Sequence, residues 1–274
     1  MSDKTQATSG EAGHKKPDEG VWETVKVVLQ ALLIAFFIRT FLFQPFNIPS
    51  GSMIPTLWVG DYLFVNKLSY GYSRYSFNFT LSLFGKDLFS FGPLDFKGRV
   101  FFADRPRRGD VVVFKLPRDP KIDYIKRVIG LPGDRIQVKH GVLYINGKAV
   151  KKERIGDFIV PEGPGRNSHI RQFRETLPNG VSYVVHDLYD NGPADNTGVF
   201  VVPPGHYFMM GDNRDNSTDS RFAREMGGVG YVPWENLVGR ATIIFFSHKP
   251  EASVWQPWMW PFVIRWSRIG TWIR

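Results

Sequence analysis

The sequence contains no cysteine, which excludes disulfide bonds, thiolate catalysis and cysteine-ligated metal sites. Histidine is also scarce and shows no HExxH or comparable ligand spacing; the residues are His14, His140, His169, His186, His206 and His248. We therefore expect neither a metal site nor a cofactor. Hydrophobic residues make up 43% of the 274 positions and aromatic residues 15%, which allows a sizeable packed core and excludes wholesale disorder.

The charge balance is basic, with 35 Lys and Arg against 26 Asp and Glu. Such an excess suits a nucleic acid or an anionic membrane surface, but most basic residues are scattered, so we expect no nucleic-acid partner. The last twenty residues are different, because they hold five of the eight tryptophans together with arginines: Trp255, Trp258, Trp260, Trp266, Trp272, Arg265, Arg268 and Arg274. Tryptophan favours the lipid headgroup layer, where arginine can meet phosphate. Residues 251–274 are predicted to form a membrane-surface segment, and the alternative is packing on the domain core.

One long apolar run is present, residues 21–43, in which seventeen of 23 residues are apolar. As a helix rising about 1.5 Å per residue it would span roughly 35 Å, enough for a bilayer core of about 30 Å. We predict a retained transmembrane anchor. A cleaved signal peptide would need a small-residue site, which Phe41–Pro45 does not offer, and a buried core helix is the other alternative. The polar residues 1–20 are predicted to be a disordered tail, which the positive-inside rule weakly places in the cytoplasm.

After Pro45 the sequence becomes β-like. Four short runs are rich in branched and aromatic side chains: residues 62–65, 111–114, 142–145 and 241–246. The dipeptide Asn146-Gly147 predicts a tight hairpin turn, and no long amphipathic helix is expected before Pro250. We predict a mostly β catalytic domain made of residues 44–147 and 201–250, interrupted by an inserted β-rich subdomain at 148–200.

A Ser-Gly-Ser turn follows the apolar run and lies between Pro49 and Pro55. The two prolines hold the hydroxyl of Ser52 in a stiff, non-helical backbone. A serine becomes a nucleophile only beside a base. By itself this segment is therefore more typical of an ordinary loop.

The second motif is the strand-like stretch Asp123–Asp134, which contains Lys126 and Arg127. Alternation along a strand sends these two side chains to opposite faces, so we expect one to face solvent and the other to face inward. A lysine in an apolar pocket has a depressed pKa and could remove a serine proton near neutral pH. Taken alone, a lysine in a strand is more typical of a solvated charge.

The third motif, residues 211–221, is dense in hydrogen-bonding side chains and follows an apolar run. A calcium-binding loop is one interpretation, but Arg214 falls inside it and no glutamate closes it. An ion pair between Asp219 and Arg221 fits the segment better.

In this order, the three motifs resemble the signature boxes of bacterial type I signal peptidases, the serine–lysine leader peptidases. The resemblance implies a mostly β fold of coiled antiparallel sheets, related to that of self-cleaving repressors, preceded by one transmembrane helix. Ser52 matches the family's nucleophile and Lys126 its general base. Ser50 matches the residue whose hydroxyl joins the Ser52 backbone N–H in an oxyanion hole.

The resemblance also gives the third motif supporting roles. Ser217 matches a hydroxyl that orients the lysine amine, while Asp219 and Arg221 match a supporting ion pair. Gly211 matches a position that keeps the wall beside the lysine open. No histidine is required.

The family removes signal peptides from exported preproteins by cutting after small-x-small sites, on the outer side of the bacterial cytoplasmic membrane. The substrate is an extended peptide that docks as an added β-strand. We expect Met53, Ile54 and Trp58 to contact the substrate or the bilayer, and core packing is the alternative for such apolar residues. The aromatic stretch 71–105 shows no catalytic group.

Three alternative functions need to be distinguished. A self-cleaving repressor of the related fold would begin with a helix-turn-helix rather than an apolar anchor. A catalytically silent anchored β-domain would not need both a serine and a lysine in matching context. A peptidase dedicated to pilus or conjugation substrates belongs to the same enzyme class, and the motifs do not separate it from a general signal peptidase.

Overall fold

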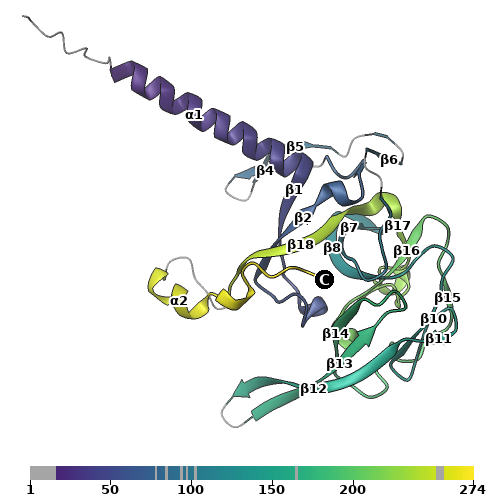
Figure 1. The fold of residues 1–274 in the computed structure, drawn as a ribbon. Helices are drawn as coiled ribbons and strands as arrows, with labels where there is room; N and C mark the ends of the chain where they lie inside the picture. The colour runs from purple at the N-terminus through teal and green to yellow at the C-terminus, as the bar shows by residue number, and fades with distance from the viewer. Residues whose placement is uncertain are drawn as a thin grey trace, which may run out of the picture.

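A long N-terminal helix, α1 (Pro17–Phe37), ends in a π-helical turn at Ile38–Leu42 and projects from the rest of the chain (Figure 1). In this computed structural model, the described residues are 17–77, 79–83, 86–92, 95–96, 98–101, 104–163, 166–250 and 256–274. Within the described chain one helical segment, Gly20–Leu42, is long and apolar enough to cross a membrane, with a mean hydropathy of 2.0. It is not buried against the domain, so the alternative of a core helix is wrong.

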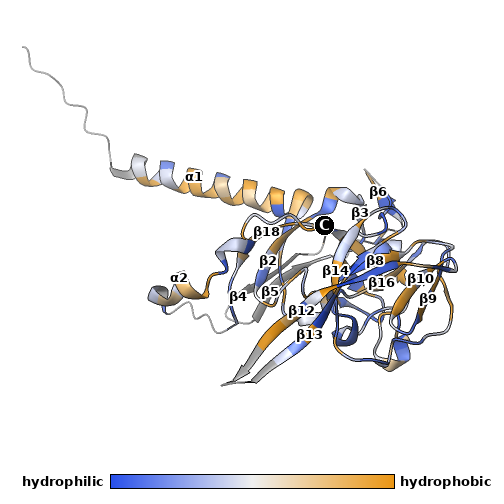
Figure 2. Cartoon of the chain, turned by 60° about the horizontal axis from the view of Figure 1, so that its bottom comes forward, coloured by the Kyte–Doolittle hydropathy of each residue, from blue (hydrophilic) through white to orange (hydrophobic). Residues whose placement is uncertain are grey.

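The start of α1 differs slightly from the prediction. The helix begins at Pro17 rather than at Val21, because proline is well tolerated in the first helical turn. Residues 1–16 of the predicted tail lie outside the described residues. Hydropathy colouring shows that most of the projecting helix is apolar (Figure 2).

The core of the domain is a seven-stranded antiparallel sheet in the order β1-β2-β18-β7-β8-β16-β17. Its strands are β1 (Phe43–Asn47), β2 (Asp61–Asn66), β18 (Leu237–Ser247), β7 (Val111–Leu116), β8 (Asp119–Gly130), β16 (His206–Met210) and β17 (Val232–Pro233). Strand β18, from the end of the domain, lies between β2 and β7. In the described sheet, β18 is therefore the strand that joins the β1–β2 pair to β7 and the strands beyond it.

A second region is built from smaller sheets at the opposite end of the domain from α1 (Figure 1). One sheet has the order β11-β10-β9-β15, from β11 (Lys148–Ala149), β10 (Val142–Ile145), β9 (Arg135–Lys139) and β15 (Phe200–Val201). The other has the order β12-β13-β14, from β12 (Lys151–Gly163), β13 (Arg166–Thr176) and β14 (Ser182–Asp187).

The predicted insertion boundary at 148 is wrong, because β10 and β11 pair across it. The apolar core of the second region also draws on both sides of that boundary, from Ile136 and Leu143 to Tyr183 and Val185. The second region therefore starts with β9.

Local sequence patterns account for most strands. The four predicted runs lie in β2, β7, β10 and β18. Asn146 and Gly147 form the two-residue turn between β10 and β11 with φ angles of 52° and 79°, the left-handed values that a type I′ hairpin turn needs. Two short antiparallel strand pairs follow β2: β3 (Tyr72–Ser73) with β6 (Arg99–Val100), and, between them in the chain, β4 (Phe79–Leu83) with β5 (Lys86–Phe91).

The C-terminal segment, residues 256–274, packs on the core and also exposes tryptophans. It contains the short helix α2 (Trp260–Val263). Arg268 binds the buried carboxylate of Asp61, with Nε 3.0 Å from Oδ1, and Ile273 packs against the apolar cluster that contains Met53 and Leu57. Arg265 donates to the carbonyl of Val59. These two arginines therefore bind groups of the domain, and contact of the segment with lipid stays a prediction.

Candidate active site

The nucleophile loop, residues 48–60, joins β1 to β2 and is fixed by its own backbone. Ile48 donates to the carbonyl of Asp61, and Gly60 donates to the carbonyl of Ile48. A 3₁₀ turn covers Gly51–Met53, which leaves Ser52 buried with 9% of its surface exposed.

Two apolar side chains anchor this loop in the core. Met53 and Leu57 are both 0% exposed and pack with Leu63, Val65 and Ile244. Met53 therefore has no surface available to a substrate or a bilayer, and that expectation is wrong for it. Instead, the buried methionine fixes the position of the adjacent serine.

Lys126 reaches Ser52 from a different part of the sheet. Its Nζ lies 2.6 Å from Ser52 Oγ and 3.1 Å from the carbonyl oxygen of Ile125. The lysine side chain is buried, with 3% of its surface exposed, on the interior strand β8. The structure thus brings together the serine and lysine that the first two motifs singled out.

Burial lowers the pKa of Lys126 from its ordinary value of 10.5 to about 8, because an ammonium ion loses its hydration there. The carboxylates of Asp219 and Asp212 act in the opposite direction, and the guanidinium of Arg221 lowers the pKa further. A substantial fraction of the amine is therefore neutral slightly above pH 7, and a neutral amine can accept the proton of Ser52.

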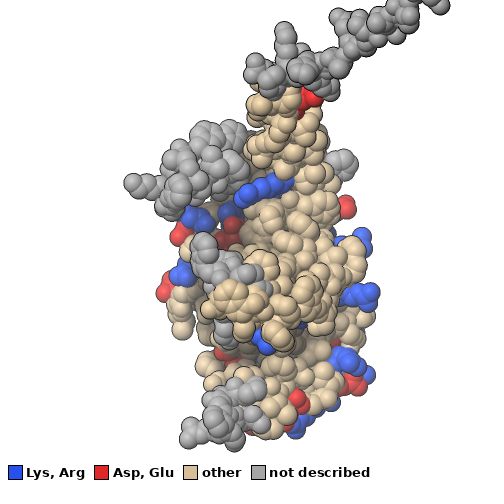
Figure 3. Space-filling model, turned by 90° about the vertical axis from the view of Figure 1, so that its left-hand side faces the viewer, with Lys and Arg blue, Asp and Glu red and all other residues tan. Residues whose placement is uncertain are grey.

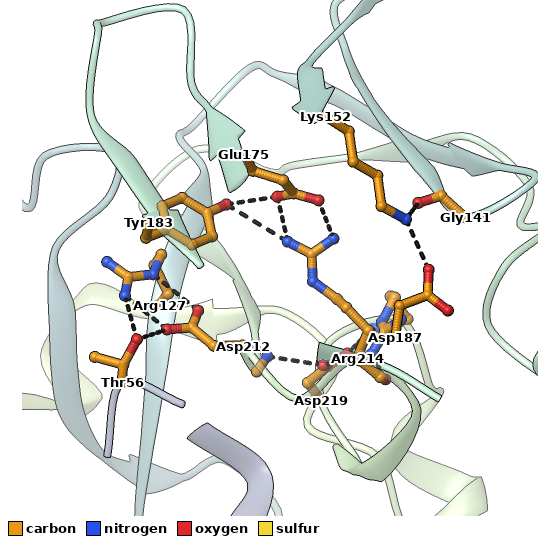
Figure 4. A network of polar contacts seen from close by, with 12 residues as sticks. Thr56, Arg127, Gly141, Lys152, Glu175, Tyr183, Asp187, Asp212, Arg214 and Asp219 are labelled. Atoms are coloured by element: carbon orange, nitrogen blue, oxygen red, sulfur yellow. Dashed lines mark hydrogen bonds and ion pairs between the residues drawn. The ribbon is translucent and has the colours of Figure 1, made fainter. Parts of the chain in front are cut away.

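Arg127 is buried as completely as its neighbour, so the expectation that one of the two side chains faces solvent is wrong. Its exposed fraction is 0%, because β8 lies inside the sheet and both of its faces are covered. The guanidinium binds Asp212 with Nη2 2.6 Å from Oδ2, and Asp212 also accepts from the hydroxyl of Thr56 (Figure 4). This network joins the strand of Lys126, the third motif and the nucleophile loop.

A second buried ion pair lies beside the first (Figure 4). Arg214 binds Glu175 in a two-pronged arrangement, and Tyr183 donates to the same carboxylate. The density of polar residues in 211–221 pointed to this cluster, but nothing in the sequence identified Glu175, which lies far away on β13.

The third motif supplies another wall of the site, through Asn216 and Thr218. Asp219 binds Arg221, with Oδ1 2.9 Å from Nε, and accepts from the backbone N–H of Gly211. A Cβ added at Gly211 would lie 2.2 Å from Ser217 Oγ and 2.5 Å from the carbonyl oxygen of Ser52. Only glycine fits there. Among the described residues, the buried hydroxyl of Ser217 has no hydrogen-bond partner and does not bind Lys126.

A cleft of about 370 Å³ opens in front of Ser52 and Lys126. Its walls come from residues 46–50 and 122–126, with Asn216 and Thr218 at one end. Ser50 lies in this cleft and is exposed, with its Oγ 3.4 Å from Ser52 Oγ. No group of three or more His, Asp or Glu side chains in the described part of the chain could hold a metal ion.

Ile54 and Trp58 are partly exposed but do not line the cleft. The indole of Trp58 packs edge-on against Phe158 with ring centroids 5.5 Å apart, and the guanidinium groups of Arg265 and Arg268 lie over it. Trp58 thus connects the nucleophile loop to the C-terminal segment, while contact of Ile54 and Trp58 with a bilayer stays a prediction.

A family model described as "Signal peptidase, peptidase S26" matches residues 21–246, which is most of the chain. The chain belongs to the signal peptidase family. It is 46% identical to a signal peptidase I of Rickettsia typhi over 224 residues, which cover 80% of this chain and 77% of that protein. A signal peptidase I of Rickettsia conorii is 45% identical over the same length and coverage.

Among solved structures, a signal peptidase I from Enterococcus faecalis matches with 25% identity and a TM-score of 0.28, covering 50% of this chain and 97% of that chain. By its family the chain is a serine endopeptidase. Its secondary structure shows a mostly β architecture that is preceded by an apolar N-terminal helix.

Proposed function

We propose that this protein is a type I signal peptidase that uses Ser52 as the nucleophile and Lys126 as the general base. The observation that carries the proposal is the 2.6 Å contact between Lys126 Nζ and Ser52 Oγ in a buried site. A lysine with a lowered pKa beside a serine hydroxyl is the pairing that serine activation without histidine requires.

In the proposed first step, the neutral amine of Lys126 takes the proton of Ser52 as Oγ attacks the scissile carbonyl carbon. The negative charge that develops on the carbonyl oxygen would be met by the backbone N–H of Ser52 and the hydroxyl of Ser50. The lysine ammonium then protonates the leaving amine, which departs as the new N-terminus of the mature protein. The remaining acyl group is held on Ser52 as an ester.

In the second step a water molecule attacks the ester, and Lys126 acts as base for the water. We assign Ser217 to orienting the amine once the ester has removed the Ser52 hydroxyl from it, because its own hydroxyl is buried and has no other partner among the described residues. Asp219 and Arg221 hold the wall that carries Ser217.

The walls of the cleft suit an extended peptide. Residues 46–50 continue the edge strand β1, and residues 122–126 belong to β8, so an incoming strand would find backbone groups on both sides. We propose that an N-terminal signal peptide binds there with small side chains near Ser52, as the family's small-x-small sites require.

We further propose that α1 crosses the bacterial cytoplasmic membrane once and that the catalytic domain lies on its outer side. The side of the molecule from which α1 and α2 project has most of its charged side chains along the edges (Figure 3). The C-terminal segment exposes several aromatic residues: Trp258, Trp260, Phe262, Trp266 and Trp272. They are suited to the lipid headgroup layer.

The test of the proposed function is cleavage of a preprotein by the full-length protein in detergent. Cleavage should occur after a small-x-small site, and Ser52→Ala or Lys126→Ala should each abolish it without unfolding the domain. Ser182→Ala and Lys152→Ala are matched controls away from the site and should retain activity. Near-normal activity of Lys126→Ala would rule out the proposed base.

A further inference from the structure

The structure contains a second buried lysine, Lys67, that the proposed reaction does not use. Its exposed fraction is 2%, and its Nζ donates to the carbonyl oxygens of Thr40 at 3.1 Å and Ser76 at 2.7 Å. Lys67 does not line the cleft in front of Ser52. Its two contacts instead join the end of the membrane helix to the catalytic domain.

The carbonyl groups at the end of a helix have no partners within the helix, and an apolar environment makes such groups costly. A cation is also favoured at this end, where the helix dipole is negative. Here the π-helical turn Ile38–Leu42 ends α1, and Thr40 lies within that turn. Lys67 therefore satisfies a carbonyl that the segment itself leaves open.

Tyr72 binds the next carbonyl. Its hydroxyl donates to the carbonyl oxygen of Phe41, and the Phe41 ring packs edge-on against the rings of Tyr72 and Phe77. Tyr72 and Phe77 are themselves stacked, with ring centroids 5.2 Å apart. Two donors and an aromatic cluster from residues 67–77 thus hold two successive residues of the helix end.

The path from this helix end to the nucleophile is short. β1 begins at Phe43, directly after the π-helical turn, and leads into the nucleophile loop. β1 is paired along its whole length with β2, from Phe43 opposite Asn66 to Asn47 opposite Tyr62. Lys67 follows β2 immediately. The same ladder therefore connects the loop of Ser52 with Lys67 and Tyr72, which together form a clamp on the helix end.

We propose that Lys67 and Tyr72 are positioning residues that fix the height of Ser52 above the membrane and thereby select which bond of a membrane-inserted preprotein is cut. This inference rests on the proposed function. A signal peptide has its apolar segment in the same bilayer as α1, so the position of the scissile bond is measured from the same surface. A free peptide without a membrane segment is not subject to this restraint.

The test compares two substrates. The first is a preprotein in phosphatidylcholine–phosphatidylglycerol vesicles with two small-x-small sites about three residues apart, roughly 10 Å of extended chain. The second is a short soluble peptide with one site. In Lys67→Met and Tyr72→Phe, the ratio of the two preprotein cuts should change about threefold or more, whereas kcat/KM for the soluble peptide should stay within about twofold.

Matched controls separate this role from general loss of buried polar contacts. Lys152→Met removes a buried lysine that binds the Gly141 carbonyl and Asp187, far from the helix end. Tyr70→Phe removes a buried hydroxyl that binds Asp110, only two residues from Tyr72. Neither should change the ratio of the cuts. In Lys67→Arg, which can still donate to both carbonyls, the ratio should return toward that of the unaltered enzyme.

A second measurement does not depend on activity. Because the chain has no cysteine, Leu33→Cys on the helix and Lys148→Cys on β11 allow two spin labels to be placed uniquely. The distance distribution between them should broaden when Lys67→Met and Tyr72→Phe are combined. If the distance distribution broadens but the ratio of cuts does not change, the selection role is overturned. If the distance distribution does not broaden, the clamp itself is overturned. If the unaltered enzyme cut neither substrate, the proposed function would fail while the distance measurement still decided the clamp.

Discussion

Cleavage should depend on pH through the amine of Lys126, which must be neutral to accept the proton of Ser52. Burial lowers the pKa of this amine to about 8, well below its ordinary value of 10.5. Because kcat/KM reports the protonation state of the free enzyme, it should rise with pH and reach half of its plateau near that pKa. At pH 6, two units lower, about one amine in a hundred is neutral, so kcat/KM should be about 100-fold below the plateau.

The assay is steady-state cleavage of a soluble peptide without titratable side chains, by the full-length enzyme in detergent, from about pH 5.5 to about pH 10. Lys67 is the essential control, because burial also lowers its pKa to about 8. Lys67→Met should leave the midpoint of the profile unchanged. His186 does not interfere, because burial lowers its pKa to about 4, below the range of the assay.

Two results would refute this reasoning. A profile that still rises at about pH 10, with no half-maximum near 8, would mean that the amine is not desolvated in the working enzyme. A midpoint that moved in Lys67→Met would assign the titration to the wrong lysine.

Other substitutions test the walls of the site. Gly211→Ala should reduce activity at least about tenfold, because the added methyl group would overlap Ser217 and the Ser52 carbonyl; Gly198→Ala, where nothing lies within 4 Å, should be silent in the same assay. Arg127→Met should lower the melting temperature strongly, as expected for about 3–5 kcal/mol when Asp212 is left unpaired, whereas Arg154→Met at an exposed pair should barely change it. Ser217→Ala should lower kcat without lowering the melting temperature, and a fall in both would mean that the hydroxyl is structural.

Local features of the fold could be predicted well from the sequence. The Asn146-Gly147 turn needs φ angles that few other residue pairs adopt, so the dipeptide alone indicated the hairpin. The runs that became β2, β7, β10 and β18 were visible because branched and aromatic residues favour a pleated, buried surface. The serine and lysine motifs were found because each lies in a short, ordered pattern.

Features that depend on distant partners could not be predicted. Arg127 was expected to alternate with Lys126, but the Asp212 carboxylate that draws it inward is 85 positions away in the chain. Glu175 is 39 positions from Arg214, and no local pattern marks it. The arginines of the C-terminal segment looked suited to lipid because the buried Asp61 that binds Arg268 lies more than 200 positions earlier.

The central place of β18 has a consequence for the order in which the enzyme can become active. Ser52 follows β1, and Lys126 lies on β8, and in the described sheet the strand order from β1 to β8 runs through β18 at Leu237–Ser247. While the chain is being made, the nucleophile emerges early beside an apolar segment, and β18 emerges long after both β1 and β8. The sheet that holds Ser52 beside Lys126 can therefore close only after β18 has been made, so late assembly of the catalytic pair follows from the strand order.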